Sequence, residues 1–329
     1  MQTKIFSSDV QCMSIKTTDG NESDTLLVVT PTCHKYFKPL EWFEENKLEI
    51  EEVLHKNGGI LLRGFGMQSV SEFNKAVQDI YPNLLDYTYR STPRTKLGGK
   101  IYTATEYPAD KIIPLHNENA YSRSWPNRIC FFCVIVAEGG GETPIADSRK
   151  VYNKIDPTIR EKFEQKGILY IRNYNKGVDL SWQDVFQTEN KEEVDKFCTE
   201  HGIEATWNTA TECPELTTKQ VCQATYVHPL TKEKVWFNQA HLFHSSSIPE
   251  HDRVLLIKEL TEKNLPRNAF YGNGEKIEVE VLDHIRKAYD DEKIKFAWNK
   301  GDIMILDNVL VAHARESFKG ERKIVVAMA

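Results

Sequence analysis

The sequence has no long apolar run and no excess of basic residues, the two features that would point to a membrane or a nucleic acid as its partner. No apolar stretch approaches the roughly 18 residues that a membrane-spanning helix needs. Residues 1–8 do not contain the apolar core of a secretory signal. The formal net charge of −6 argues against non-specific nucleic-acid binding, which needs a basic face. We therefore expect a cytoplasmic protein.

Paired cysteine motifs and nucleotide-binding loops are also missing. The seven cysteines are scattered, and Cys130 and Cys133 have no second CxxC with which to complete a zinc site. Both lie in an apolar run typical of a buried strand, so we expect reduced thiols that point to opposite faces of a sheet. The glycines at 139–141 fit neither GxxxxGK[ST] nor GxGxxG, which favours a tight turn between strands over a phosphate loop.

The sequence does contain short strand patterns at both ends of a more helical middle. Strands are predicted at 60–65, 128–137, 168–174, 225–228, 234–239, 294–298, 303–306 and 323–328. Helices are predicted at 40–56, 69–80, 148–162, 191–202, 249–264 and 277–289. Residues 84–111 are polar and irregular and are interpreted as a loop region. Because no linker-like tract separates two halves, the pattern predicts one mainly β domain with attached helices (α+β), built like a barrel.

His116 and Glu118 are the first candidates for chemistry, and they stand two residues apart in the stretch 112–120. In an extended chain this spacing places both side chains on one face. An imidazole and a carboxylate are two of the three ligands in the facial 2-His-1-carboxylate site of non-heme Fe(II) oxygenases. A chain with ten histidines and 48 acidic residues can hold such a pair by chance, so the spacing alone does not establish a site.

The C-terminal part supplies two further candidates. His313 follows a predicted strand and a turn, where a third metal ligand could stand. Arg322 lies nine residues later, at the start of the last predicted strand, with the same parity as Ile324 and Val326. An arginine on an otherwise apolar wall requires an anion, because an unpaired buried charge is costly. A carboxylate bound through two hydrogen bonds is its natural partner.

Taken together, these segments resemble the TauD/TfdA superfamily of Fe(II)- and 2-oxoglutarate-dependent oxygenases. Within it, the chain is most similar to the branch around the syringomycin-pathway aspartate hydroxylase (SyrP-like), near the clavaminate-synthase-like enzymes, in which the carboxylate ligand is also Glu. The similarity runs in family order from about Gly58 to the end. It is carried by residues 115–121, 140–149, 172–174, 181–188, 235–244 and the C-terminal block.

The resemblance implies a double-stranded β-helix (jelly roll) with a helical insertion at about 148–292, an N-terminal extension at 1–57, and a single domain over 1–329. It implies that His116, Glu118 and His313 bind iron and that Thr143 and Arg322 bind 2-oxoglutarate. Lys323 directly follows Arg322, so either cation could grip the cosubstrate, although strand parity favours Arg322. Ala314 stands where the family more often has Gly before an arginine.

The substrate side is predicted from position in the sequence. Asn119 and Tyr121 follow the ligand pair closely, and Arg172 ends a predicted strand. Asn238 is a pocket or a turn residue, and Arg315 contacts substrate or forms a structural salt bridge. His241 and His244 are expected in an extended segment as structural or substrate-contacting residues, in preference to a second metal pair.

By resemblance, the cofactors are Fe(II), 2-oxoglutarate and O₂, and the reaction is hydroxylation of a small polar substrate. Glu118 is retained where related halogenases have a small residue, which favours hydroxylation over halogenation. An amino acid or an aminoacyl group on a peptidyl carrier protein, hydroxylated at its β-carbon in natural-product biosynthesis, is the leading hypothesis. The alternatives are desaturation or cyclisation with the same cofactors, a jelly-roll enzyme that uses Zn²⁺ without 2-oxoglutarate, and a binding module that has lost catalysis.

Overall fold

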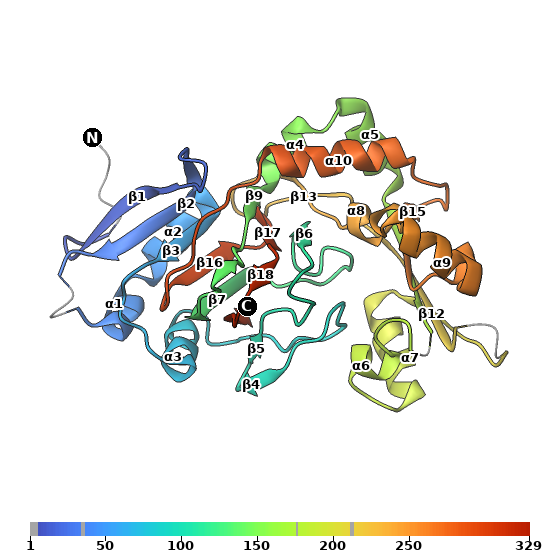
Figure 1. The fold of residues 1–329 in the computed structure, drawn as a ribbon, viewed down its shortest axis with the longest axis horizontal. Helices are drawn as coiled ribbons and strands as arrows, with labels where there is room; N and C mark the ends of the chain where they lie inside the picture. Colours follow the sequence, from blue (N-terminus) through green and yellow to red (C-terminus); the bar gives the residue numbers. More distant parts are fainter. Residues whose placement is uncertain (1–5, 34–36, 176, 211–213) are drawn as a thin grey trace.

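Two β-sheets face each other and form the frame of the molecule in a computed structural model that describes residues 6–33, 37–175, 177–210 and 214–329 (Figure 1). The smaller sheet has the order β6 (Ile113–His116), β17 (Val311–Arg315) and β9 (Ile145–Asp147). A short pair, β8 (Gly139–Gly140) and β18 (Phe318–Lys319), continues beside it. The larger sheet has the order β1 (Val10–Lys16), β2 (Glu22–Pro31), β3 (Gly59–Leu62), β16 (Ile303–Asp307), β7 (Arg128–Ile135), β19 (Lys323–Met328), β5 (Ile101–Thr103) and β4 (Lys96–Gly98).

The alternation of side chains in β7 explains how the two layers hold together. Phe131 and Cys133 point inward and pack with Ile145 of β9 and Val311 of β17, so both sheets share one hydrophobic cluster. Cys130 and Phe132 point outward into a second cluster beneath the N-terminal helices. The prediction of reduced thiols on opposite faces is therefore confirmed for Cys130 and Cys133, which are free and buried. Burial raises the pKa of Cys133 to about 12. Cys213 lies outside the described residues.

The outer face of the large sheet is covered by α1 (Pro39–Glu45), α2 (Lys47–Asn57) and α3 (Val70–Ile80). Phe43, Val53 and Phe73 from these helices are fully buried against the strands. The predicted capping box opens α3, since the Ser69 hydroxyl accepts from the Glu72 amide and the Glu72 carboxylate accepts from the Ser69 amide. The predicted helix 40–56 is instead two helices that meet at Asn46.

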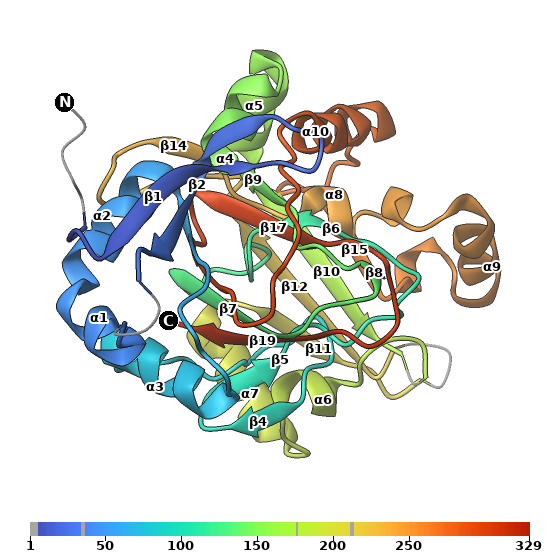
Figure 2. The same cartoon turned by 60° about the vertical axis from the view of Figure 1, so that its left-hand side comes forward.

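The middle of the chain adds a second body of sheet and helices against the frame (Figure 2). Its four-stranded sheet has the order β11 (Glu204–Trp207), β12 (Leu216–Cys222), β10 (Ile168–Tyr174) and β15 (Arg267–Tyr271), and a hairpin joins β13 (Thr225–Val227) to β14 (Lys234–Trp236). The helices are α4 (Ser148–Lys154), α5 (Pro157–Lys166), α6 (Trp182–Phe186), α7 (Lys191–His201), α8 (Ala240–Phe243), α9 (Glu250–Leu260) and α10 (Val279–Asp291). Short 3₁₀ turns lie at Ser245–Ser247 and Glu262–Asn264.

Several sequence predictions of elements are wrong. The predicted helix 148–162 breaks before Pro157, which starts α5 because proline suits the first turn of a helix. Residues 84–111 are not all loop, since β4 and β5 form there at the edge of the large sheet. Residues 294–298 form no strand beyond one bridge between Ile294 and Ile145. Helix α9 buries none of its side chains, so it is not an amphipathic core helix.

None of the helices in the described parts of the chain has both the length and the apolar character to cross a membrane.

Candidate metal centre

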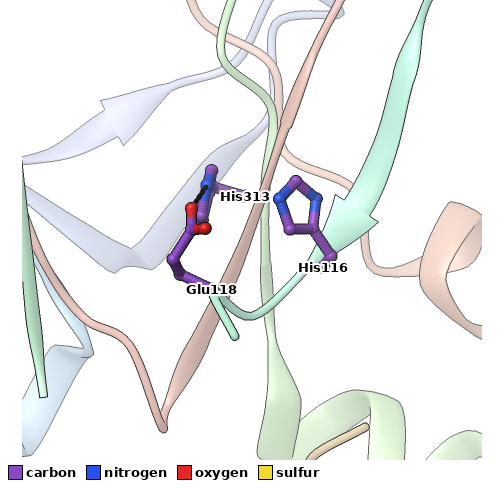
Figure 3. A group of neighbouring side chains, drawn as sticks. All are labelled: His116, Glu118 and His313. Atoms are coloured by element: carbon purple, nitrogen blue, oxygen red, sulfur yellow. Dashed lines mark ion pairs between the residues drawn. The ribbon is translucent and has the colours of Figure 1, made fainter. Parts of the chain in front are cut away.

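His116, Glu118 and His313 converge between the two sheets (Figure 3). The strands β6 and β17 run antiparallel, and their register sets His313 directly opposite His116. The two imidazole rings have centroids 4.6 Å apart, and His313 Nε2 lies 3.8 Å from Glu118 Oε2. One nitrogen or oxygen atom from each of the three side chains lies within 4.8 Å of the others. Among the described residues, this is the one group of three potential ligands with such spacing.

Glu118 reaches this point from a turn, not from a strand as the sequence pattern predicted. Strand β6 ends at His116, and the chain turns through Asn119, whose φ is +55°. Left-handed backbone is uncommon outside glycine but tolerated by asparagine. The turn brings the carboxylate back toward the two histidines, so the three side chains meet without the extended spacing (Figure 3).

Asn308, at the end of β16, fixes this turn. Its Oδ1 accepts from the Glu118 amide at 2.7 Å, and its Nδ2 donates to the Glu118 carbonyl at 3.0 Å. Asn117 donates to the Asn308 carbonyl at 2.7 Å, and Gln239 donates to the Asn117 carbonyl at 2.7 Å. Both backbone groups of Glu118 are thus held by one side chain from the turn that follows β16. Sequence reasoning missed Asn308, because nothing in its local pattern marks a contact 190 positions away.

Both histidines are in the protonation state that binds a metal. The His116 Nδ1 lies 2.8 Å from the Pro114 carbonyl, which places the proton on Nδ1 and leaves Nε2 bare. Burial lowers the pKa of His116 below its usual value, and burial holds the pKa of His313 well below it, with His116 nearby as the second cause. Two neutral imidazole nitrogens and one carboxylate on one side of a centre are the ligand set that suits non-heme Fe(II). The residues present therefore fit an iron ion.

Thr143 and Arg322 lie together and line one cavity with His116 and His313. The Thr143 hydroxyl accepts from Trp298 Nε1 at 3.0 Å and from Arg322 Nη2 at 3.3 Å, while Arg322 Nε donates to the Gly141 carbonyl at 2.8 Å. No Asp or Glu of the described residues forms a salt bridge with Arg322. Burial, with Arg315 as the next cause, lowers the pKa of Arg322 to about 10, so it remains a cation at neutral pH. Lys323 is not among the residues that line the cavity.

Arg94 is the second residue that sequence reasoning missed. It lies in the segment interpreted as a loop, and its Nη2 donates to Glu118 Oε2 at 2.6 Å in a buried ion pair. Arg94 lines the same cavity as His116, His313 and Arg322. Its 24-residue separation from Glu118, across irregular chain, leaves no periodicity that could have identified the contact.

Three of the predicted substrate residues lie in two different places: Asn119 lines a cavity, whereas Tyr121 and Arg172 belong to an aromatic cluster. Asn119 lines a second cavity of about 250 Å³ together with Tyr87, Tyr89 and other residues. Tyr121 is buried and donates to the Tyr89 carbonyl at 2.7 Å and to Asn119 Oδ1 at 3.2 Å. Arg172 packs its guanidinium 4.9 Å from the ring centre of Tyr89 and donates to the backbone of the same segment, away from the three converging side chains. Asn119 is thus the member of this set that faces open space.

Asn238 and Arg315 make backbone contacts. Asn238 donates to the Ala224 carbonyl at 2.7 Å and accepts from the Ala240 amide, which corresponds to the turn alternative. Arg315 lines the cavity and donates to the carbonyls of Tyr107, Pro108 and Lys111, and it forms no salt bridge with an acidic side chain of the described residues. Its contact with substrate stays a prediction.

The two histidines after Asn238 do not lie in an extended segment. His241 is in helix α8, and His244 ends that helix. His241 Nε2 lies 2.9 Å from the Leu115 carbonyl, and His244 Nδ1 lies 2.9 Å from the Ser246 hydroxyl. These contacts with the backbone and a hydroxyl match a structural role.

Comparisons with known proteins give a consistent result. A model of the taurine catabolism dioxygenase TauD, TfdA family matches residues 30–328. The chain is 44% identical over 279 residues to the dapdiamide synthesis protein DdaC of Enterobacter agglomerans, covering 85% of this chain and 84% of that one. It is 28% identical over 289 residues to a clavaminate synthase-like protein of Arabidopsis thaliana, covering 85% and 83%.

Solved structures share the fold at low sequence identity. PvcB, described as an Fe, alpha-ketoglutarate dependent oxygenase from an isonitrile synthetic pathway, aligns with a TM-score of 0.58 at 14% identity over 100% of this chain and 94% of that one. AAD-2 in complex with Mn(II) and N-oxalylglycine aligns with a TM-score of 0.53 at 12% identity, covering 97% and 96%. The predicted fold, an α+β jelly roll with attached helices, is confirmed.

Proposed function

Because the chain belongs to the taurine catabolism dioxygenase TauD, TfdA family and is an Fe(II)- and 2-oxoglutarate-dependent dioxygenase, we propose that it hydroxylates a small polar substrate in a natural-product pathway. His116, Glu118 and His313 are proposed to hold the iron. Thr143 and Arg322 are proposed to hold the distal carboxylate of 2-oxoglutarate. The observation that carries this proposal is that His116, Glu118 and His313 converge, and that the two histidines line a cavity together with Arg322, a partly buried arginine with no acidic partner among the described residues.

Some of these side chains would bind the metal ion, and others would position their neighbours or exclude water. An iron ion held by His116, Glu118 and His313 would, with 2-oxoglutarate and O₂, supply the oxidising power for hydroxylation. His116 and His313 would offer neutral nitrogens to the ion and Glu118 a carboxylate oxygen, a set of three ligands that would leave room for the cosubstrate and O₂. Trp298 donates to Thr143 and so orients the hydroxyl that lies beside Arg322. Phe131, packed edge-on at 5.2 Å against His313, keeps the inner wall apolar and limits the access of water.

The choice of substrate rests on the relatives and on the residues around the iron site. The name of DdaC places it in dapdiamide synthesis, and PvcB comes from an isonitrile synthetic pathway, which supports a role in natural-product biosynthesis. We propose an amino acid or an aminoacyl group, free or on a peptidyl carrier protein, with hydroxylation at the β-carbon. Asn119, which faces the cavity beside the ligand turn, is the first candidate for contact with it.

We further propose that the chain works as one catalytic domain, because His116 and His313 come from strands on either side of the middle segment. A cytoplasmic location is proposed from the six described cysteines, which are free thiols.

Anaerobic titration tests the proposal. Fe(II) is added first and 2-oxoglutarate second, and the absorbance is followed for a metal-to-ligand charge-transfer band. We expect a band that saturates with 2-oxoglutarate, followed by succinate formation when O₂ and substrate are added. Tight Zn²⁺ binding with no such band would favour the zinc-dependent alternative. Product masses then separate hydroxylation, which adds one oxygen atom, from desaturation or cyclisation, which removes two hydrogen atoms.

A further inference from the structure

Arg94 is a buried arginine with unused hydrogen-bonding capacity. Its side chain is 4% exposed, and one of its nitrogens, Nη2, donates to Glu118. Nε and Nη1 have no partner among the described residues. A guanidinium has five N–H donors, and leaving buried donors unpaired costs free energy. Such an arrangement is stable when a ligand supplies the missing acceptors.

The position of this guanidinium is fixed by its neighbours. It lies 4.4 Å from the ring centre of Tyr87, and its other anchor is the carboxylate of Glu118. Tyr87 lines the cavity of about 250 Å³ that Asn119 also lines, whereas Arg94 itself lines the cavity of His116 and His313. Arg94 therefore lines the cavity of the two histidines while its guanidinium packs against a ring that lines the second cavity.

The charges around the iron side point to an anionic ligand. Arg94, Arg315 and Arg322 line this cavity, and no Asp or Glu of the described residues lines it with them. Glu118 is the acidic partner of Arg94. Asp110 lies near enough to Arg315 and Glu142 near enough to Arg322 to influence those two cations, whereas the acidic group acting on Arg94 is a proposed metal ligand, whose charge a bound ferrous ion would share. A substrate that brings a further negative charge is favoured, because excess charge of one sign in a buried site is costly.

We propose that Arg94 is a specificity-determining residue that binds a carboxylate of the primary substrate beside the iron, through the N–H groups that Glu118 leaves unused. This inference rests on the proposed function and narrows it: the substrate is a small molecule or tethered group that carries a free carboxylate. A forked guanidinium suits a carboxylate better than it suits a neutral amide, because the hydrogen bonds are charge-assisted and two can form in parallel. The same chemistry could serve the carboxylate of 2-oxoglutarate next to its keto group, so the test separates these two sources.

Acetate is the probe for the site, and acetamide is its neutral counterpart. Each is titrated anaerobically into the protein saturated with Fe(II) and 2-oxoglutarate, and the charge-transfer band is followed. In the wild type, acetate should shift the band in a saturable manner and acetamide should not. Arg94→Gln should weaken acetate binding about tenfold or more while the affinity for 2-oxoglutarate stays within about threefold. Arg90→Gln is the matched control from the same segment, also placed over the Tyr87 ring, and should respond as the wild type does.

The Arg94→Lys variant tests whether the effect of Arg94→Gln arises only from damage to the iron site. Lysine keeps a cation beside Glu118 but removes the fork, so iron and 2-oxoglutarate should bind while acetate binding weakens. A wild-type response to acetate in both Arg94 variants, or no response in the wild type, would overturn the inference. The inference would also be overturned if the Arg94 variants lost as much 2-oxoglutarate affinity as Arg322→Ala does while they kept the acetate response. That result would assign Arg94 to the binding of the cosubstrate. Absence of the charge-transfer band in the wild type would instead contradict the proposed function.

Discussion

At the scale of single residues, Glu118 is held as firmly through its backbone as through its carboxylate. Asn308 satisfies both the amide and the carbonyl of Glu118 and also donates to the Pro126 carbonyl at 2.8 Å. All three contacts are buried, so removing the side chain leaves unpaired backbone groups without access to water. Residues behind the ligands of a metal site commonly determine its affinity by fixing the orientation of the ligands.

Asn308→Ala should therefore lower both stability and metal affinity. We expect a loss of about 2–4 kcal/mol in the free energy of unfolding, because several buried hydrogen bonds disappear, and a fall in Fe(II) affinity of about 10- to 100-fold. Urea unfolding and anaerobic Fe(II) titration measure the two effects. Asn153→Ala, at an exposed position of α4, is the control and should change neither. Wild-type iron affinity in the Asn308 variant would show that the turn holds its shape unaided.

The neighbouring cations Arg322 and Lys323 allow a paired test of cosubstrate binding. Arg322 lies in the cavity against Thr143, whereas Lys323 is the first residue of β19 and does not line it. Arg322→Ala should weaken 2-oxoglutarate binding by about 2–4 kcal/mol, the usual range for one partner of a buried charge pair, with Fe(II) binding retained. Lys323→Ala should leave the affinity near the wild-type value. The reverse pattern would assign the anchor to Lys323.

How far the site could be predicted also differs residue by residue. His116, His313, Thr143 and Arg322 lie in segments that resemble a family, and the structure brings them into one cavity. Arg94 and Asn308 could not be found, because their contacts with Glu118 depend on how distant segments fold together. Asn238 and the histidines after it were harder to place, since a four-residue helix carries too little periodicity to be distinguished from a strand.

At the scale of elements, the junction of α2 with β3 supports the strand that carries His313. Gly58 ends α2 with a φ of +96°, and its amide donates to the Leu54 carbonyl. A Cβ added there would collide with Cγ2 of Val311, two residues before His313. Gly66 also has a positive φ, +77°, but a Cβ there would meet no atom within 4 Å. Comparing a substitution at Gly58 with one at Gly66 therefore distinguishes the cost of a left-handed backbone from the cost of a steric clash.

Gly66→Ala should cost about 1–2 kcal/mol in the free energy of unfolding, the penalty of a left-handed alanine. Gly58→Ala should cost about 1–3 kcal/mol more than that, because overpacking adds to the same strain. Denaturant unfolding of both variants beside the wild type gives the difference. Equal losses in the two variants would mean that Val311 moves aside freely, and the iron affinity of the Gly58 variant would then stay unchanged.

Elements with strong local signals were predicted well, and those fixed by tertiary contacts were not. The capping box of α3 and the apolar run of β7 are local features, and both elements form where the sequence placed them. Strand β6 ends at His116, and the turn that follows is held by a hydrogen bond to Asn308. No feature of the sequence 112–120 indicates this distant contact. Strand β5 forms by pairing with β19, and β4 forms by pairing with β5 at the edge of the large sheet.

At the scale of the whole molecule, the general architecture followed from the resemblance, but the second sheet of the middle segment did not. Helix patterns dominate 148–292, while β10, β12 and β15 are far apart in sequence and become one sheet only on folding. The first two strands were also missed, since β1 and β2 alternate weakly and gain their place by pairing with β3 of the large sheet.

Buried histidines should make the global stability depend on pH. Burial is the main cause that lowers the pKa of His241 from 6.5 to about 3 and that of His244 from 6.5 to about 4. Below pH 6.5 the unfolded chain takes up protons on these residues and the folded chain does not, so acid favours unfolding. Each of these two histidines should lower the free energy of unfolding by about 1.4 kcal/mol per pH unit as the pH falls from 6.5 toward the pKa of that histidine in the folded protein.

Urea unfolding of the metal-free protein between pH 7.5 and 4.5 measures this slope. His241→Gln should flatten it, because one of the groups that takes up a proton on unfolding is gone, whereas exposed His251→Gln should leave it unchanged. An identical slope in the wild type and the His241 variant would mean that His241 is protonated in the folded protein as well.

The register that sets His116 opposite His313 has a consequence beyond catalysis. These residues stand 197 positions apart in the sequence, and the whole middle segment forms a loop whose two ends meet at them. An ion bound by both side chains would act as a removable cross-link across that loop, and cross-links that close long loops restrict the unfolded chain most in principle. Supply of iron would then govern the lifetime of the protein as well as its activity: the loaded form would resist proteolysis, and the empty form would be opened and degraded first.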